Sequence, residues 1–133
     1  MICVIDASAA VEIAMKKSGA ADLINRIMAA DKVIAPTLFH AEVGNVFRKY
    51  VQGGHIDEGQ ALSLYRTAIR IVDEFADIQT LADEAVVEAI RLSHSVYDMF
   101  YLILARRNGA KLLTCDKKLQ AVYVSHYNTT QQS

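Results

Sequence analysis

The segment SVYDMFYLILARRNGAKLLTCD, residues 95–116, carries the strongest structural pattern of the chain. Apolar side chains occupy most positions of Val96–Arg107, and Asn108-Gly109 is typical of a helix C-terminus. This part therefore predicts a helix that is buried on most of its surface. The next apolar run, KLLTC at residues 111–115, predicts a buried strand.

Upstream of this segment, short apolar runs alternate with longer segments of helical periodicity. The alternation predicts a three-layer α/β/α domain with a mainly parallel central sheet. A strand just after Asp77, in DIQTL, has the weakest pattern because only Ile78 and Leu81 are apolar. The other expected strands are residues 2–5 and 32–36, and the other expected helices are residues 7–15, 19–30, 37–52, 57–71, 82–92 and 116–122.

The length and composition of the chain limit its architecture. With 133 residues, 53% of them hydrophobic, it can bury one core and is too short for two typical domains. We expect a single domain over residues 1–126 and a polar C-terminal tail over residues 127–133. Because the first residues lack a signal-peptide pattern and no apolar stretch reaches about 18 residues, we expect a soluble cytoplasmic protein without membrane contact.

Charge and cysteine content narrow the classes of function. The net charge is −1, so nucleic-acid binding would depend on a local patch, for which Lys117 and Lys118 are candidates. Cys3 and Cys115 lack the spacing of a zinc site. Both fall in expected strands, where cysteine is usually a small buried apolar residue. Their offset of roughly 10 Å along parallel strands is too large for a disulfide.

Four acidic residues stand out by position. Asp6 ends the first expected strand, Asp116 follows the last one, and Asp98 lies in the first turn of the most apolar helix. Glu42 lies at the edge of the apolar stripe of an earlier helix. Taken one at a time, the three aspartates could serve as helix caps and the glutamate as a solvated flank of its helix.

Taken together, the positions of these acids suggest a metal site. The carboxyl ends of parallel strands point to one edge of a sheet, so Asp6 and Asp116 should emerge there with Asp98 alongside. Carboxylates that converge raise one another's pKa unless cations lie between them. A site of oxygen ligands favours Mg²⁺ or Mn²⁺ over zinc. Such ions position and activate a water for attack on a phosphodiester, and they would offset the charge of Asp98 on its apolar helix.

The chain resembles, over nearly its whole length, the PIN-domain ribonucleases, in particular the VapC-type toxins of toxin–antitoxin pairs, and three segments carry the motifs. The segments are VIDASAAVEI at residues 4–13, APTLFHAEVGNVFRK at 35–49 and LSHSVYDMFYLILARRNGAKLLTCDKKL at 92–119. The resemblance implies that Asp6 and Asp98 ligate the metal directly, and that Asp116 joins them or binds a second ion. It implies that Glu42 binds the metal directly or through water and orients the nucleophile.

The same resemblance implies further properties. Ser8 and Thr114 would orient carboxylates through their hydroxyls, although both residue types also suit helix starts. The family implies a five-stranded parallel sheet and Mg²⁺-dependent endonucleolytic cleavage of RNA. It also implies inhibition by a cognate antitoxin and frequent homodimers.

The chain departs from the family pattern at a few positions. Met99 and Phe100 stand where smaller residues are common, and bulk at Met99 would narrow the mouth of the site. Cys115 occupies the middle of the Thr-x-Asp motif. The polar sequence after Val122 does not clearly encode the edge strand that the family implies.

Histidine and aromatic residues offer additional candidates. His40 lies two residues before Glu42 and His94 lies four before Asp98, which raises the question of a mixed metal site. On helical spacing, His40 should point away from Glu42. Three aromatic residues near Asp98 are expected to belong to the core rather than to a base-stacking surface: Tyr97, Phe100 and Tyr101.

Two alternative functions remain at this point. A phosphoacceptor signalling domain has a similar length and gathers acids around Mg²⁺, but it requires paired acids after the first strand and a strand-end lysine late in the chain. The segments VIDAS and LLTCD supply a single acid and no such lysine. A catalytically silent relative that acts as a binding module is the second alternative, and the complete set of four acids argues against it.

Overall fold

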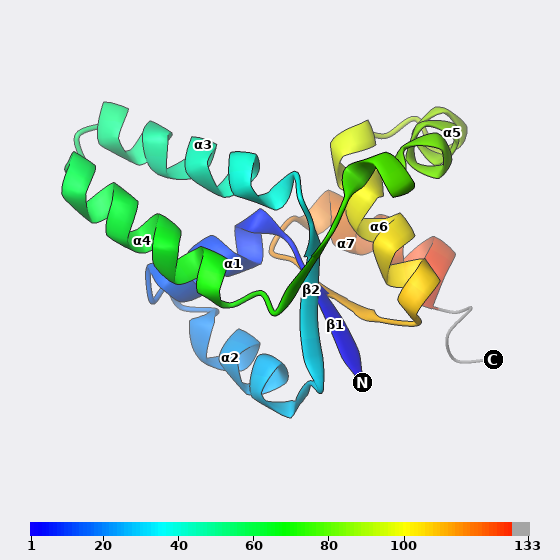
Figure 1. Ribbon diagram of the computed structural model, residues 1–133, viewed down its shortest axis with the longest axis horizontal. Coiled ribbons are helices and arrows are strands. Elements are labelled where there is room, and N and C mark those ends of the chain that lie inside the picture. Colours follow the sequence, from blue (N-terminus) through cyan, green and yellow to red (C-terminus); the bar gives the residue numbers. More distant parts are fainter. Residues whose placement is uncertain (129–133) are drawn as a thin grey trace.

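The computed structural model describes residues 1–128, which form a parallel sheet with helices on both sides (Figure 1). The expected polar tail lies, from residue 129 onward, outside the described residues. No helix within residues 1–128 is long and apolar enough to cross a bilayer. The elements in order are β1 (Ile2–Ile5), α1 (Ala7–Ala14), α2 (Ala20–Ala29), β2 (Lys32–Pro36), α3 (Phe39–Gln52), α4 (Glu58–Arg70), β3 (Glu74–Ala76), η1 (Ile78–Thr80), α5 (Ala82–Leu92), α6 (Val96–Asn108), β4 (Lys111–Leu113), α7 (Lys117–Tyr123) and η2 (Val124–Asn128).

The sheet of the described residues has four strands in the order β3-β2-β1-β4, and every pair is parallel. β1 lies in the centre, where Val4 pairs with Ile34 of β2 and with Leu112 of β4. This architecture confirms the predicted α/β class and the parallel sheet. The fifth strand implied by the resemblance does not appear within residues 1–128, because the chain after Val122 continues as the helical turns of α7 and η2.

The third strand lies earlier in the chain than predicted. We expected it just after Asp77, but β3 ends at Ala76 and η1 follows. The side chain of Asp77 accepts a hydrogen bond from Gln79 N at 2.9 Å, which caps the turn of η1 and ends the extended backbone. β3 contains a single large apolar residue, Phe75, so its sequence has too little hydrophobic periodicity to be predicted.

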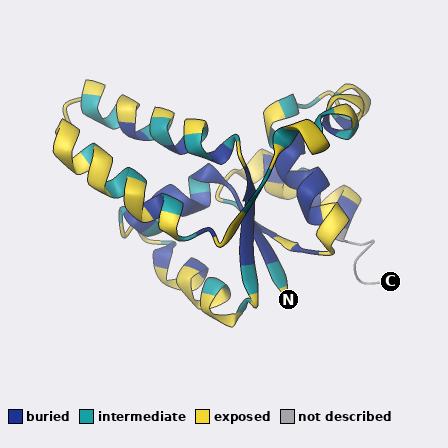
Figure 2. Cartoon of the chain, in the orientation of Figure 1, coloured by how far each residue is buried: buried dark blue, intermediate teal, exposed yellow. Residues whose placement is uncertain are grey.

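Helix α6 is the central helix of the core, as its sequence predicted. Every residue of Met99–Ala105 is buried, and α6 packs against β1, β2 and β4 (Figure 2). α5 covers α6, whereas α1 packs against α2, α3 and α4 (Figure 1). Phe100 and Tyr101 are buried as expected, but the prediction was wrong for Tyr97, which is 59% exposed. Tyr97 lies in the first turn of α6, before the buried segment begins.

The two cysteines have different environments. Cys3 is buried in β1, as predicted, and burial raises the pKa of its thiol. Cys115 is exposed, contrary to the prediction, because β4 ends at Leu113 and Cys115 lies in the loop before α7. Both thiols are free.

Candidate functional site

The four candidate acids all follow the carboxyl ends of strands or open the helices that start there. Asp6 directly follows β1 and caps α1, and Asp116 follows β4 and caps α7. Glu42 and Asp98 lie in the first turns of α3 and α6. Capping therefore takes place at Asp6 and Asp116, but it leaves part of each carboxylate available for other partners. Asp98 makes no capping box, because Ser95 accepts instead from Tyr97 N at 3.2 Å.

Asp6 is the most buried of the four acids, with 6% of its surface exposed. Its Oδ1 accepts hydrogen bonds from Ser8 Oγ at 2.7 Å and from Ala9 N at 3.0 Å, and its Oδ2 accepts from the hydroxyl of Thr114. Burial raises the pKa of Asp6 above its ordinary value despite these donors, and the charge of Asp98 raises it further. Asp6 is therefore a rigidly held carboxyl group, and its hydrogen bonds do not fully offset the cost of burying its negative charge.

The loop after β4 is tied to this carboxylate. Thr114 donates to Asp6 and accepts from Asp116 N at 3.0 Å, while Ser8 accepts from Cys115 N at 2.9 Å. Ser8 and Thr114, which the resemblance assigned to orienting carboxylates, thus both bond to Asp6. The bonds fix the position of Asp116 relative to Asp6 through the backbone.

Glu42 is held by a residue whose polar role the sequence did not indicate. Tyr101 donates its hydroxyl to Glu42 Oε1 at 2.6 Å. Burial raises the pKa of Glu42, and the charges of Asp98 and Asp6 raise it further. Tyr101 was predicted only as a core residue, yet its spacing three residues after Asp98 places both side chains on one face of α6. That spacing is the signal that would have revealed it.

Asp98 also has a partner that sequence reasoning did not assign. Nε2 of His94 lies 2.8 Å from Oδ2 of Asp98, in the connection between α5 and α6. The other histidine considered, His40, packs its ring on Phe75 with centroids 4.3 Å apart. The carboxylate of Glu42 reaches α6 instead, in agreement with the expectation that His40 points elsewhere.

Asp6, Glu42 and Asp98 lie near one another: Glu42 is bonded to Tyr101, one turn after Asp98 on α6, the charge of Asp98 raises the pKa of Asp6, and the charges of Asp98 and Asp6 raise the pKa of Glu42. Within residues 1–128, however, no three His, Cys, Asp or Glu side chains converge closely enough to hold an ion as they stand. Each of the three carboxylates is turned toward a protein donor instead. These three acids are thus neighbours, but their oxygens are not arranged as the ligands of a metal ion.

The donor set nevertheless fits a hard divalent cation. Glu42 Oε2, Asp98 Oδ1 and Asp116 Oδ2 accept no hydrogen bond from the described residues, while the second oxygen of each carboxylate is held. Carboxylates that repel one another and keep free oxygens are the ligands that Mg²⁺ and Mn²⁺ prefer. Glu42, Asp98 and Asp116, together with the adjacent Asp6, whose two oxygens already accept hydrogen bonds, are the residues that would hold such an ion.

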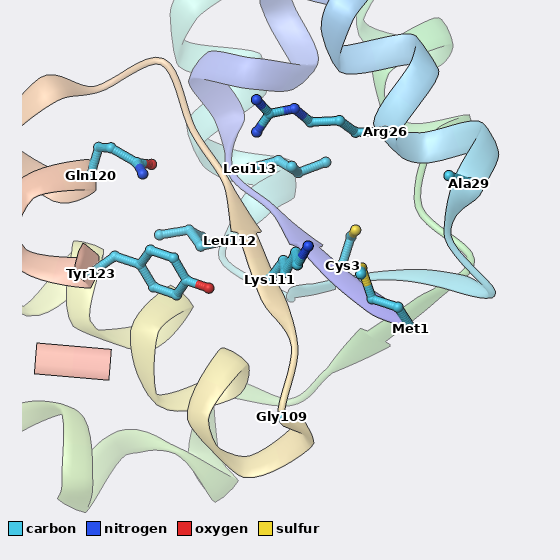
Figure 3. A pocket seen from close by; sticks show the side chains of 10 residues that line it. All are labelled: Met1, Cys3, Arg26, Ala29, Gly109, Lys111, Leu112, Leu113, Gln120 and Tyr123. Carbon is cyan, nitrogen blue, oxygen red and sulfur yellow. The ribbon is translucent and has the colours of Figure 1, made fainter. Parts of the chain in front are cut away.

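A cavity of about 660 Å³ lies elsewhere on the molecule (Figure 3). Lys111 and Tyr123 line it beside β4, and Cys3 lines it from β1. None of the four acids contributes to its walls. The acids gather instead at the carboxyl ends of the strands, where α/β proteins bind their ligands. The geometry of the acids therefore identifies the candidate site, and the size of this cavity does not.

Comparison with known proteins agrees with this fold. The family model described as PIN domain matches residues 3–124. The chain is 32% identical over 122 residues to ribonuclease VapC1 of Mycobacterium tuberculosis strains CDC 1551 / Oshkosh and ATCC 25618 / H37Rv, covering 90% of this chain and 89% of that protein.

Two crystal structures share the architecture. PAE2754 from Pyrobaculum aerophilum superimposes with a TM-score of 0.73 and 25% identity, covering 91% of this chain and 84% of its own. Mycobacterium tuberculosis VapC20, described as a sarcin–ricin-loop-cleaving toxin, gives a TM-score of 0.69 with 13% identity, covering 90% and 94% of the two chains. The match of the family model over most of the chain, together with the identity to ribonuclease VapC1, shows that this protein belongs to the PIN domain family.

Proposed function

We propose that this protein is a metal-dependent endoribonuclease toxin of the VapC type that hydrolyses RNA phosphodiester bonds. The observation that carries the proposal is the placement of Asp6, Glu42, Asp98 and Asp116 at strand ends and helix starts, with one oxygen of each of the last three held and the other not bonded by any of the described residues. The similarity to ribonuclease VapC1 over 90% of the chain supports the same activity. Mg²⁺ is the proposed cofactor. Mn²⁺ can replace it, because it also prefers oxygen ligands.

The proposed ligands are Asp6, Asp98 and Asp116, and a cation bound to them would neutralise their repulsion and polarise the phosphate and the attacking water. The protein supplies orientation. Three donors hold the carboxylate of Asp6, namely the hydroxyls of Ser8 and Thr114 and the backbone N–H of Ala9, so this carboxylate needs little reorganisation on binding.

Glu42 is the proposed acceptor of the proton from the attacking water. Tyr101 holds Oε1, which leaves Oε2 to take the proton. The raised pKa of Glu42 brings its basicity nearer to neutral pH, where a general base is most effective. Removing charge from Glu42 would therefore lower the rate even where the fold and the metal affinity are retained.

Exposed residues near the site suit an RNA substrate. Lys117 and Lys118 follow Asp116 directly, and both are exposed, so they can contact phosphates. Tyr97 adjoins Asp98 and presents an aromatic ring to solvent on which a base can stack. Lys117, Lys118 and Tyr97 would set the position of the RNA strand relative to the four acids.

Protein partners are part of the proposal. We infer that a cognate antitoxin neutralises the activity in the cytoplasm and that the chain forms a homodimer. The exposed apolar residues Val86, Val87 and Ile90 on α5 support association with another protein surface.

The phosphoacceptor alternative gains no support, because Thr114 and Cys115 follow β4 where that class needs a lysine.

Incubation of the purified protein with single-stranded and structured RNA tests the proposal. Cleavage should require Mg²⁺ or Mn²⁺, stop in EDTA and disappear in Asp98→Asn, whose fold should be intact by circular dichroism. Cleavage by Asp98→Asn at the wild-type rate would refute the assignment. Labelling of an aspartate by acetyl phosphate would instead favour the phosphoacceptor class.

A further inference from the structure

The connection between α5 and α6 places a histidine in a fixed position. Ser93 ends α5 in the left-handed conformation, with φ 50°, which costs a residue with a Cβ about 1–2 kcal/mol. His94 N then donates to Ala89 O at 3.0 Å, and Ser95 caps α6 through Tyr97 N. Because both neighbours of His94 are held by helix ends, its backbone has little freedom.

The ring of His94 is directed at the candidate site. Its Nε2 lies 2.8 Å from Asp98 Oδ2, and the two side chains are only 14% and 27% exposed. An ionised carboxylate only accepts hydrogen bonds, so the hydrogen belongs to Nε2 and the ring is the donor. Oδ1 of Asp98 accepts no hydrogen bond from the described part of the chain. One oxygen is therefore held and the other remains available.

We propose that His94 is a positioning residue for Asp98: its Nε2–H fixes Oδ2 so that Oδ1 is presented to the metal. This inference rests on the proposed function. An aspartate in a first helical turn has several staggered side-chain conformations, and a donor on one oxygen selects among them. Outer hydrogen-bond partners of metal ligands commonly change metal affinity about 10- to 100-fold when removed.

Two other acids of the site, Glu42 and Asp116, support this assignment by their similar arrangement, whereas both oxygens of Asp6 accept hydrogen bonds. Tyr101 holds Oε1 of Glu42, and the amides at the start of α7 hold Oδ1 of Asp116, and each leaves the second oxygen free. His94 performs the same task for Asp98 from a connection that is itself held at both ends. The common pattern indicates pre-organisation of the carboxylates before a cation binds.

Mn²⁺ binding, followed by the electron paramagnetic resonance signal of the free ion, tests the inference. His94→Leu removes the donor and should raise the Kd for Mn²⁺ about 10- to 100-fold. His94→Gln keeps an amide donor of similar reach and should stay within about threefold of wild type. His126→Leu removes an exposed imidazole on η2 and is the matched control with unchanged affinity.

A second readout separates positioning from simple structural support. In His94→Leu, the Mg²⁺ concentration for half-maximal RNA cleavage should rise, while the rate at saturating Mg²⁺ is retained. If His94→Leu fails to fold, His94→Asn provides the same comparison, because its shorter side chain stays polar and falls short of Oδ2. Melting in EDTA then shows that the variant is folded.

Several results would overturn the inference. One is a Kd for Mn²⁺ in His94→Leu that is equal to or lower than that of wild type. Another is direct ¹⁴N coupling to bound Mn²⁺ in the wild-type protein, which would show that His94 is itself a metal ligand. If wild type binds Mn²⁺ and Asp98→Asn does not, an unchanged His94→Leu refutes the positioning role alone. A wild-type protein that binds no Mn²⁺, or binds it equally well as Asp98→Asn, refutes the proposed function as well.

Discussion

Tyr101 donates its hydroxyl to Glu42 Oε1 at 2.6 Å and so joins the core helix α6 to the first turn of α3. Tyr101 is only 1% exposed, and burial followed by the charge of Glu42 raises the pKa of its phenol. The phenol therefore stays protonated and can only donate to the carboxylate. A buried neutral donor holds one oxygen of Glu42 without changing the charge of the site.

Replacing Tyr101 with Phe should destabilise the protein, because Oε1 of the half-buried Glu42 loses its donor. We expect the free energy of unfolding in EDTA to fall by about 1–3 kcal/mol, measured by urea denaturation. The lost hydrogen bond had lowered the pKa of Glu42, so that pKa should rise further, which NMR titration can follow. Tyr97→Phe, an exposed change on the same helix, should stay within about 0.5 kcal/mol of wild type. Equal stability of the two variants would contradict the role of this hydrogen bond.

Replacing Thr114 with Val should weaken the link between β4 and Asp6. The change keeps the shape of the side chain but removes the donor to Asp6 and the acceptor of Asp116 N. We expect a loss of about 1–3 kcal/mol in stability, together with a higher Kd for Mn²⁺. Thr67→Val, on the exposed α4, removes a hydroxyl that bonds only to Ser63 O at 3.0 Å and is the matched control. The same Mn²⁺ Kd in both variants would argue against the orienting role.

The metal-free protein should become less stable as pH rises through the mildly acidic range. The pKa values of Asp6 and Glu42 in the folded state lie above their ordinary values of 3.8 and 4.5. At any pH between the ordinary and the raised pKa of each acid, the native state therefore binds more protons than the unfolded state. The free energy of unfolding must then fall with rising pH, by about 1.4 kcal/mol for each unit of pKa difference. Urea denaturation in EDTA between about pH 4.5 and 7 measures this slope.

Two controls define that window. Glu84 and Glu88 have pKa values lowered by their arginine partners, so their stabilisation is lost only as pH falls below about 4.5. Asp6→Asn should flatten the slope, because it removes the most buried carboxyl group of the described residues. With saturating Mg²⁺ the dependence should reverse, since binding requires deprotonated carboxylates. A stability that rises with pH in EDTA would show that the acids are not destabilised when ionised.

The placement of the acids could be predicted because backbone position alone determines it. Asp6 and Asp116 follow strands, and Asp98 opens a helix of unmistakable apolar character, so a parallel sheet brings them to one edge. The hydrogen-bond donors could not be predicted in the same way. The spacing of His94 and Tyr101 from Asp98 places them on its side of α6, but which carboxylate oxygen each one contacts depends on side-chain conformations and on how α3 crosses α6.

The errors in the fold have comparable physical causes. β3 contains one large apolar side chain, Phe75, and the apolar residues that suggested a strand belong to the capped turn after Asp77. Cys115 was assigned to a strand because KLLTC is continuous in apolar character, but β4 ends at Leu113 and the loop turns outward. In both cases a short apolar run indicates a buried segment of the chain but does not determine the residue at which the strand ends.

The central claim is that these carboxylates meet around a hard cation at the carboxyl edge of the sheet. A crystal grown in MnCl₂, with diffraction data collected at the manganese absorption edge, tests it most directly. We predict an anomalous peak within about 2.0–2.3 Å of oxygens of Asp6 and Asp98, with Asp116 bound to the same or a second ion. Asp98 and Asp116 would turn their free oxygens toward it. The absence of any peak at this edge, with the acids in their metal-free positions at saturating Mn²⁺, would contradict the account.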